Sequence, residues 1–166
     1  MRREYIDSMP DLHATWLSHL RRQQQRWLDA LPSQCAVCGR WPGPRICRDC
    51  HARWAQHKHR CHSCALPLPA LVSLCGNCLK QPPRLKRCTA ALDYAYPWQN
   101  LITRYKFQAD LGLARSLGRL MASHPEVREQ LRACDALLPM PASAQRVRER
   151  GFDHSLLLAR SLSEQY

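Results

Sequence analysis

The sequence has no apolar run near the roughly 20 residues that a membrane-spanning helix needs, so we expect no membrane insertion. The charged N-terminus, residues 1–7, is not followed by an apolar core, which argues against a signal peptide and for a cytoplasmic location. Acidic residues are also scarce, with 13 Asp and Glu against 25 Lys and Arg. The chain nevertheless has 166 residues and is 45% apolar, enough for one domain, or for one small domain and part of another.

The positive charge is concentrated in the middle of the chain. Residues 35–88 hold ten Lys and Arg against one acidic residue, Asp49, for a net charge of +9. Residues 1–34 carry +1 and residues 89–166 carry +2. Eight of the ten cysteines lie in the same region, within residues 35–78. The sequence therefore divides into a helical leader (1–34), a basic cysteine-rich module (35–87) and a mixed helix and strand segment (88–166).

Four Cys-x-x-Cys pairs lie in the cysteine-rich module. Such a turn places two sulfurs on one side of a tight loop, and two turns complete a tetrahedral shell of four sulfurs that suits structural zinc. Eight cysteines therefore predict two closed zinc sites, which organise a fold but lack the open position that catalysis needs. The predicted ligands are Cys35, Cys38, Cys47, Cys50, Cys61, Cys64, Cys75 and Cys78.

The pairs repeat as a first cysteine unit, residues 35–50, and a second, residues 61–78. Consecutive pairing closes short loops at low entropic cost, so it is favoured over a cross-braced arrangement. Redox disulfides are a third reading, but a redox Cys-x-x-Cys normally occurs once, at the start of a helix. The module also contains four histidines, His51, His57, His59 and His62. Any of them could replace a thiolate as a ligand, but they are better explained as solvent-facing or phosphate-contacting residues.

The basic residues of the module could bind phosphates, or they could solubilise a small domain and balance its thiolates. Eight thiolates with two Zn²⁺ contribute about −4, so the module stays basic after metal binding. Trp41 and Trp54 could stack on bases, but in so small a module they are better explained as its core. The basic residues are Arg40, Arg45, Arg48, Arg53, Lys58, Arg60, Lys80, Arg84, Lys86 and Arg87.

Apolar periodicity predicts the elements outside the module. An amphipathic leader helix is expected over residues 10–30. After the module, residues 88–96 are predicted to form a strand, and helices should follow from Trp98, from about Leu111 and over residues 125–132. Cys88 and Cys134 have no nearby partner and are expected to be small buried hydrophobes.

A second strand, short and buried, is predicted over residues 136–141. It is followed by a basic loop over residues 142–154 and an apolar helix from about Ser155. A strand, a basic loop with a glycine and a helix start can together hold an anion, because backbone N–H groups and the positive helix end face the loop. The alternative is an exposed basic loop without a ligand.

The order of these features resembles the ComF/GntX family, bacterial phosphoribosyltransferase-like proteins associated with competence and DNA utilisation. The resemblance covers residues 35–166 and implies a double zinc ribbon followed by a type I phosphoribosyltransferase-like (Rossmann-like) α/β domain. The shared landmarks are the four Cys-x-x-Cys pairs, Tyr94-Ala95-Tyr96-Pro97, Leu101-Ile102 leading to Lys106-Phe107, Pro139-Met140-Pro141 and Arg150-Gly151-Phe152.

The resemblance also implies site residues. In such domains the loop after the first core strand contacts pyrophosphate, which makes Arg146, Arg150 and Gly151 the candidate pyrophosphate contacts. Family members usually continue Arg-Gly-Phe with Asn-Gln, where this chain has Asp153-His154.

The family's phosphoribosyl diphosphate loop pairs two acidic residues with a Thr/Gly-rich turn, and no two acidic residues are adjacent in this chain. Residues 88–166 are therefore interpreted as the N-terminal part of an incomplete, C-terminally truncated α/β domain. We expect no phosphoribosyl transfer by this chain, and phosphoribosyl diphosphate only in full-length relatives.

Two functions follow from the sequence. The first is a ComF-like accessory protein for competence and DNA uptake, with single-stranded DNA or proteins of the competence machinery as partners. The alternative is a stand-alone zinc-ribbon module that binds nucleic acid or protein.

Overall fold

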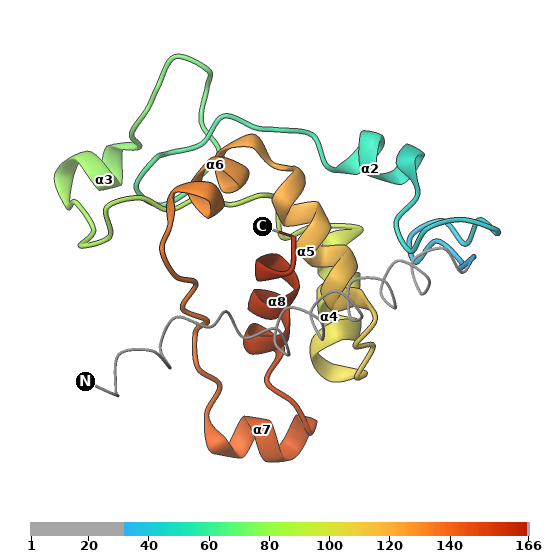
Figure 1. The fold of residues 1–166 in the computed structure, drawn as a ribbon. Coiled ribbons are helices and arrows are strands. Elements are labelled where there is room, and N and C mark those ends of the chain that lie inside the picture. The colour runs from blue at the N-terminus through green and yellow to red at the C-terminus, as the bar shows by residue number, and fades with distance from the viewer. Residues whose placement is uncertain (1–31, 166) are drawn as a thin grey trace, which may run out of the picture.

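The computed structural model describes residues 32–165, whose regular elements are helices joined by long irregular segments (Figure 1). Two short helices belong to the cysteine-rich module, α2 (Arg48–Trp54) and α3 (Gly76–Lys80). The later helices are α4 (Trp98–Phe107), α5 (Leu113–Ser123), α6 (Pro125–Ala133), α7 (Ala144–Arg150) and α8 (His154–Ser163). None of these helices has the length and apolar character needed to cross a membrane. The leader helix predicted over residues 10–30 lies outside the described residues.

The helices predicted after residue 97 are confirmed as α4, α5, α6 and α8. The loop predicted over residues 142–154 is partly wrong, because α7 lies within it. Ser143 caps the start of α7 by accepting a hydrogen bond from the Arg146 N–H at 3.3 Å. Gly151 ends it in the left-handed conformation, with φ of +78°. Serine at the start and glycine at the end are ordinary helix boundary signals, so the sequence did mark this helix.

Neither predicted strand forms. In residues 32–165 the only β pairings are two isolated antiparallel bridges, Ser33 with Gly43 and Arg60 with Pro67. Within residues 32–165, residues 88–96 make one backbone hydrogen bond to a distant segment, from the Cys88 N–H to the His62 carbonyl at 2.9 Å, and residues 136–141 make none. A strand exists only where a second backbone accepts and donates a ladder of such bonds. Burial of the second segment was also wrong, since Leu138 is 95% exposed. The described residues therefore show cysteine clusters and helices but no sheet.

The main core joins the helices to the first cysteine unit. Trp54, Val37 and Ile46 from the module pack against the buried cluster, and the Trp98 indole donates a hydrogen bond to the Trp54 carbonyl at 2.9 Å. The first unit and the helices thus share one hydrophobic core. The buried cluster comprises Trp98, Leu101, Tyr105, Leu113, Ala114, Leu117 and Leu120.

Ion pairs also attach the module to the rest of the chain. Arg45 pairs with Asp110, and both Lys58 and Arg60 pair with Asp93. Hydrogen bonds from Lys58 and Arg60 lower the pKa of the Asp93 carboxyl. Farther along, Arg87 and Glu126 pair at 2.9 Å, and Arg40 pairs with Asp49 inside the module. Half of the ten basic residues therefore pair with carboxylates.

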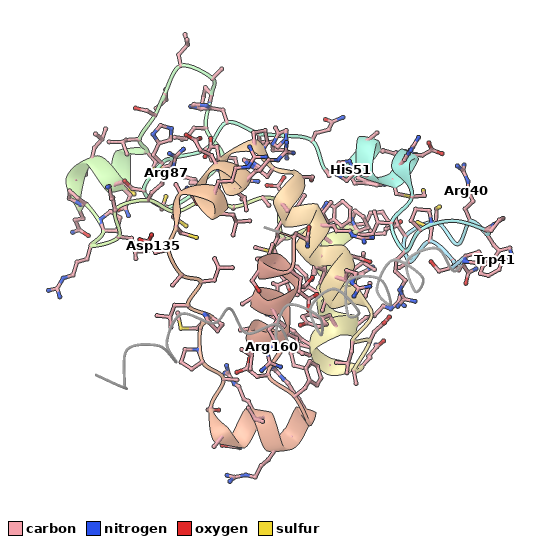
Figure 2. The ribbon with its side chains drawn as sticks, in the orientation of Figure 1. Arg40, Trp41, His51, Arg87, Asp135 and Arg160 are labelled. Carbon is pink, nitrogen blue, oxygen red and sulfur yellow. The ribbon has the colours of Figure 1, made fainter. Side chains whose placement is uncertain are left out.

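Two predictions of burial were wrong. Trp41 is 61% exposed, and Figure 2 shows it with Arg40 at the outer edge of the first unit. The interior of that unit is occupied by Cys35, Cys47 and Cys50, so a large indole has no place there. Cys134 directly follows α6 and is exposed.

The crossing of α5 over α8 depends on a glycine. A Cβ on Gly118 would lie 2.8 Å from the Ser161 Oγ, and overpacking of this kind costs about 1–3 kcal/mol. Alanine gains about 1 kcal/mol over glycine inside a helix, so we expect Gly118→Ala to lower the free energy of unfolding by up to about 2 kcal/mol in urea denaturation.

Adding Ser161→Ala should recover most of that loss, because it removes the closest atom. Gly76→Ala is the matched control, since nothing lies within 4 Å of its added Cβ. A Gly118→Ala chain more stable than the wild type, by the full helix-propensity gain of about 1 kcal/mol, would show that the two helices are not in this contact.

Candidate metal centres and anion-binding surfaces

Each cysteine unit gathers four sulfur atoms, all within 4.8 Å of one another. The Sγ atoms of Cys35 and Cys50 are 3.9 Å apart and those of Cys38 and Cys47 are 3.8 Å apart. In the second unit, Cys64 and Cys75 have an Sγ separation of 3.7 Å. The structure thus brings consecutive pairs together and does not cross-brace them. The clusters are Cys35, Cys38, Cys47 and Cys50, and then Cys61, Cys64, Cys75 and Cys78.

The sulfur separations fit a tetrahedral metal ion. Zinc–sulfur bonds of about 2.3 Å place the corners of a tetrahedron about 3.8 Å apart, whereas a disulfide requires about 2.05 Å. The observed separations match the first value, and all ten cysteines are free thiols. Each unit therefore has the donor atoms and the spacing for one structural metal ion, and a set of four thiolates suits zinc.

Local backbone geometry produces the same cluster twice. Cys47 caps α2 and Cys75 caps α3, each sulfur accepting the N–H three residues later at 3.5 Å. The N–H of Cys47 donates to the Cys35 sulfur at 3.4 Å, and the Cys75 N–H donates to Cys61 in the same way. These donors stabilise negative charge on sulfur before any metal binds.

The thiols within one cluster differ in acidity. The Cys75 N–H lowers the pKa of Cys61 to about 6. Burial acts to raise the pKa of Cys35, but hydrogen bonds from the Cys38 and Cys47 N–H groups outweigh it and the pKa is about 6. Burial and the neighbouring sulfurs raise the pKa of Cys50, and they raise that of Cys78 to about 12. A dication between the sulfurs removes this repulsion and allows four thiolates.

The candidate pyrophosphate contacts lie on and just after α7. Arg146 and Arg150 are four residues apart and therefore face the same side of this helix, and Gly151 ends it. The Arg150 guanidinium lies 4.7 Å from the centroid of the Phe107 ring and 3.2 Å from the His154 Nδ1. The structure thus places Arg150 beside the end of α4, while Arg146 is exposed.

The start of α8 is already capped. The Asp153 carboxylate accepts the N–H groups of Ser155 and Leu156 at 2.9 and 3.0 Å, and that of Ala142 at 3.4 Å. These bonds, led by that of Leu156, lower the pKa of Asp153. The sequence predicted that the N–H groups at the start of this helix would bind an anion, but the Asp153 carboxylate already accepts them. An anion at this loop would therefore rely on arginine side chains.

An aromatic surface that was not predicted from the sequence lies beside the first unit. Tyr96 lies edge-on to Trp54 with ring centroids 5.2 Å apart, and the Arg53 guanidinium lies 5.0 Å from the Trp54 ring centroid. Tyr94 and Tyr96 are 67% and 57% exposed. Assigning residues 88–96 to a strand hid this surface, although the Tyr-Ala-Tyr-Pro motif marked its position.

Metal content tests the cysteine clusters. We expect about two zinc ions per chain after purification under reducing conditions, and about one after Cys61→Ser, because one cluster then loses a ligand. Cys88→Ser and Cys134→Ser are the matched controls and should leave the metal content unchanged. Chelation should unfold residues 35–78, seen as faster hydrogen exchange there. Wild-type protein without zinc would contradict the assignment.

The Asp153 cap predicts a pH dependence. Because its pKa is lowered by folding, its stabilising contribution is complete above the unfolded value of about 3.9 and is lost as the pH falls through the folded pKa. An asparagine at the same position would still cap the helix without titrating.

We therefore expect the wild type to lose its stability advantage over Asp153→Asn as the pH falls from about 6 to 3, measured by urea denaturation. Metal loss at low pH affects both chains and cancels in the difference. A difference that does not change with pH would rule out the cap.

Comparisons with known proteins place the chain among named relatives. It is 32% identical over 142 residues to the DNA utilization protein YhgH of Escherichia coli K12 and of Shigella flexneri, which covers 80% of this chain and 61% of theirs. It is 32% identical over 123 residues to competence protein F of Haemophilus influenzae, which covers 71% of this chain and 52% of that protein.

The chain thus spans between half and two thirds of the length of these curated relatives. No protein-family model matches it, and no solved structure matches it. Two four-cysteine clusters in its structure agree with the double zinc ribbon that the resemblance implied. The chain is therefore homologous to competence protein F and to the DNA utilization protein YhgH, and the ComF resemblance seen in its sequence is confirmed.

Proposed function

We propose that this chain is a competence and DNA-utilisation accessory protein whose two four-cysteine clusters bind zinc and whose aromatic surface beside the first unit contacts single-stranded DNA. The observation that carries the proposal is the homology to proteins named for competence and DNA utilisation. The cysteine clusters supply a rigid support, since closed sites of this kind organise a fold and do not catalyse.

The DNA contact is assigned to the surface formed by Arg53, Trp54, Tyr94 and Tyr96. Arg53 forms no ion pair within residues 32–165, so its charge is available to phosphates. Exposed tyrosine rings can stack on bases of any sequence, because every base has a π face. Cationic and aromatic groups side by side are the usual combination for binding single strands.

Residues 88–165 are assigned to a phosphoribosyltransferase-like α/β domain without transferase activity in this chain. The homology and the landmark motifs support this assignment, with Arg146, Arg150 and Gly151 as the pyrophosphate contacts. Turnover of phosphoribosyl diphosphate by the purified chain would refute the inactivity. A cytoplasmic location accompanies the proposal, and ten free thiols favour a reducing compartment.

The alternative of a stand-alone zinc-ribbon module is less well supported for the first unit. Its residues share a hydrophobic core with α4 and α5, and Arg45 pairs with Asp110. A unit built into a larger core is not independent of it. The second unit has a separate small core of Cys61, Cys75 and Cys78, with Leu68 and Leu74 packed on it.

Binding to a single-stranded oligonucleotide tests the proposed surface. We expect affinity to fall as salt rises, because phosphate contacts release counterions, and Arg53→Gln should reduce the slope of log K against log salt by about 1. Tyr96→Ala should weaken binding about 5- to 100-fold through lost stacking.

Arg148→Gln is the control for the arginine change, because Arg148 is exposed on α7 and its replacement removes the same charge elsewhere. Metal content should be equal in all variants. Affinity that ignores salt, or variants that bind like the wild type, would exclude this surface.

A further inference from the structure

A cavity of about 870 Å³ lies where the first cysteine unit meets α5 and α8. Its described lining includes neither a cysteine nor any residue of α7, so it is distinct from the metal clusters and from the pyrophosphate candidates. We propose that this cavity binds a nucleotide through its phosphate group. This goes beyond the proposed DNA contact, which uses a different set of residues.

The cavity is lined by basic side chains from three parts of the chain. Arg45 comes from the first unit, Arg115 and Arg119 lie one turn apart on α5, and Arg160 lies on α8. Figure 2 shows Arg160 on α8 in the middle of the molecule. Glu164 is the one acidic residue of the described lining. Several guanidinium groups around one space favour a phosphate, which their planar N–H pairs bind in a bidentate way.

Two buried polar atoms at the cavity lack a partner within the part of the chain that the structure describes. Ser161 is only 7% exposed, and its Oγ has no hydrogen bond. The Nε of Arg45 is also buried without a partner, although its Nη2 pairs with Asp110. A buried polar group without a hydrogen bond is unfavourable, so both atoms are suited to an incoming oxygen. Ser161 is held in place because it packs against Gly118.

The remaining lining favours a nucleotide over inorganic phosphate. Ile46, Leu111, Leu120 and Leu157 supply apolar surface beside the arginines. The volume lies in the range of about 300–1,000 Å³ that is typical of small-molecule sites. A deoxynucleoside 5′-phosphate has a phosphate for the arginines and a base for the apolar side. A free nucleotide and the phosphorylated end of a DNA strand share this chemistry.

Calorimetric titration of the zinc-loaded full chain with deoxyadenosine 5′-monophosphate tests the site. We expect saturable binding, at least tenfold stronger than that of deoxyadenosine or inorganic phosphate alone. Arg160→Gln should lower the affinity for the nucleotide at least tenfold, because it removes one arginine from the cavity. Arg148→Gln changes the net charge equally and should bind like the wild type, since Arg148 does not line the cavity.

A smaller substitution, Ser161→Ala, tests the site in case Arg160→Gln disturbs folding. Ser161→Ala removes only the unpartnered hydroxyl and relaxes the contact with Gly118, so the chain should unfold at the same or higher urea concentration. Its nucleotide affinity should fall several-fold. The proposal is overturned if the wild type does not bind the nucleotide, if deoxyadenosine binds equally well, or if both cavity variants bind like the wild type.

Competition distinguishes the two sources of the phosphate. An oligonucleotide with a 5′-phosphate that displaces the mononucleotide, when its unphosphorylated form does not, identifies a DNA end. Displacement by free nucleotides alone identifies the small molecule. The Arg53→Gln variant should weaken oligonucleotide binding and leave mononucleotide binding unchanged, so either proposal can fail without the other.

Discussion

The clustering of four sulfur atoms in each cysteine unit is the interaction on which residues 35–78 depend. This segment has two short helices and two isolated bridges, and its own buried apolar surface is small. Backbone N–H groups directed at sulfur hold the thiols in place, yet the thiols oppose one another once they ionise. A metal ion resolves that conflict, because it converts the repulsion between thiolates into four bonds.

The charge of the module has two uses in the folded chain. Arg45, Lys58, Arg60 and Arg87 reach carboxylates beyond residue 88 and so hold the module against the helical part. Each exposed pair contributes little by itself, but together they set the orientation of the two parts. The module was predicted to use its basic residues for phosphates or for solubility, and the structure adds a third use.

Features that depend on contacts between residues close in the sequence were predicted, and features that depend on distant residues were not. The sulfur clusters depend on contacts only 3 to 17 residues apart, and a Cys-x-x-Cys repeat encodes those directly. The helices α4, α5 and α6 follow from apolar periodicity for the same reason. The prediction of strands at residues 88–96 and 136–141 was wrong because a strand needs a distant backbone partner, which its own residues cannot specify. The prediction that Trp41 lies in the core of the module was wrong because the cysteines fill the interior of the first unit.

The sequence by itself determined the eight clustered cysteines, the positions of most helices and the ComF resemblance, all of which are written in short spacings. Only the tertiary structure decided that Tyr96 meets Trp54 and that Arg45, Arg115 and Arg160 line one cavity. Tyr96 lies 42 residues beyond Trp54 and Arg160 lies 115 residues beyond Arg45. No local pattern links such residues, because packing of the helices against the first unit brings them together.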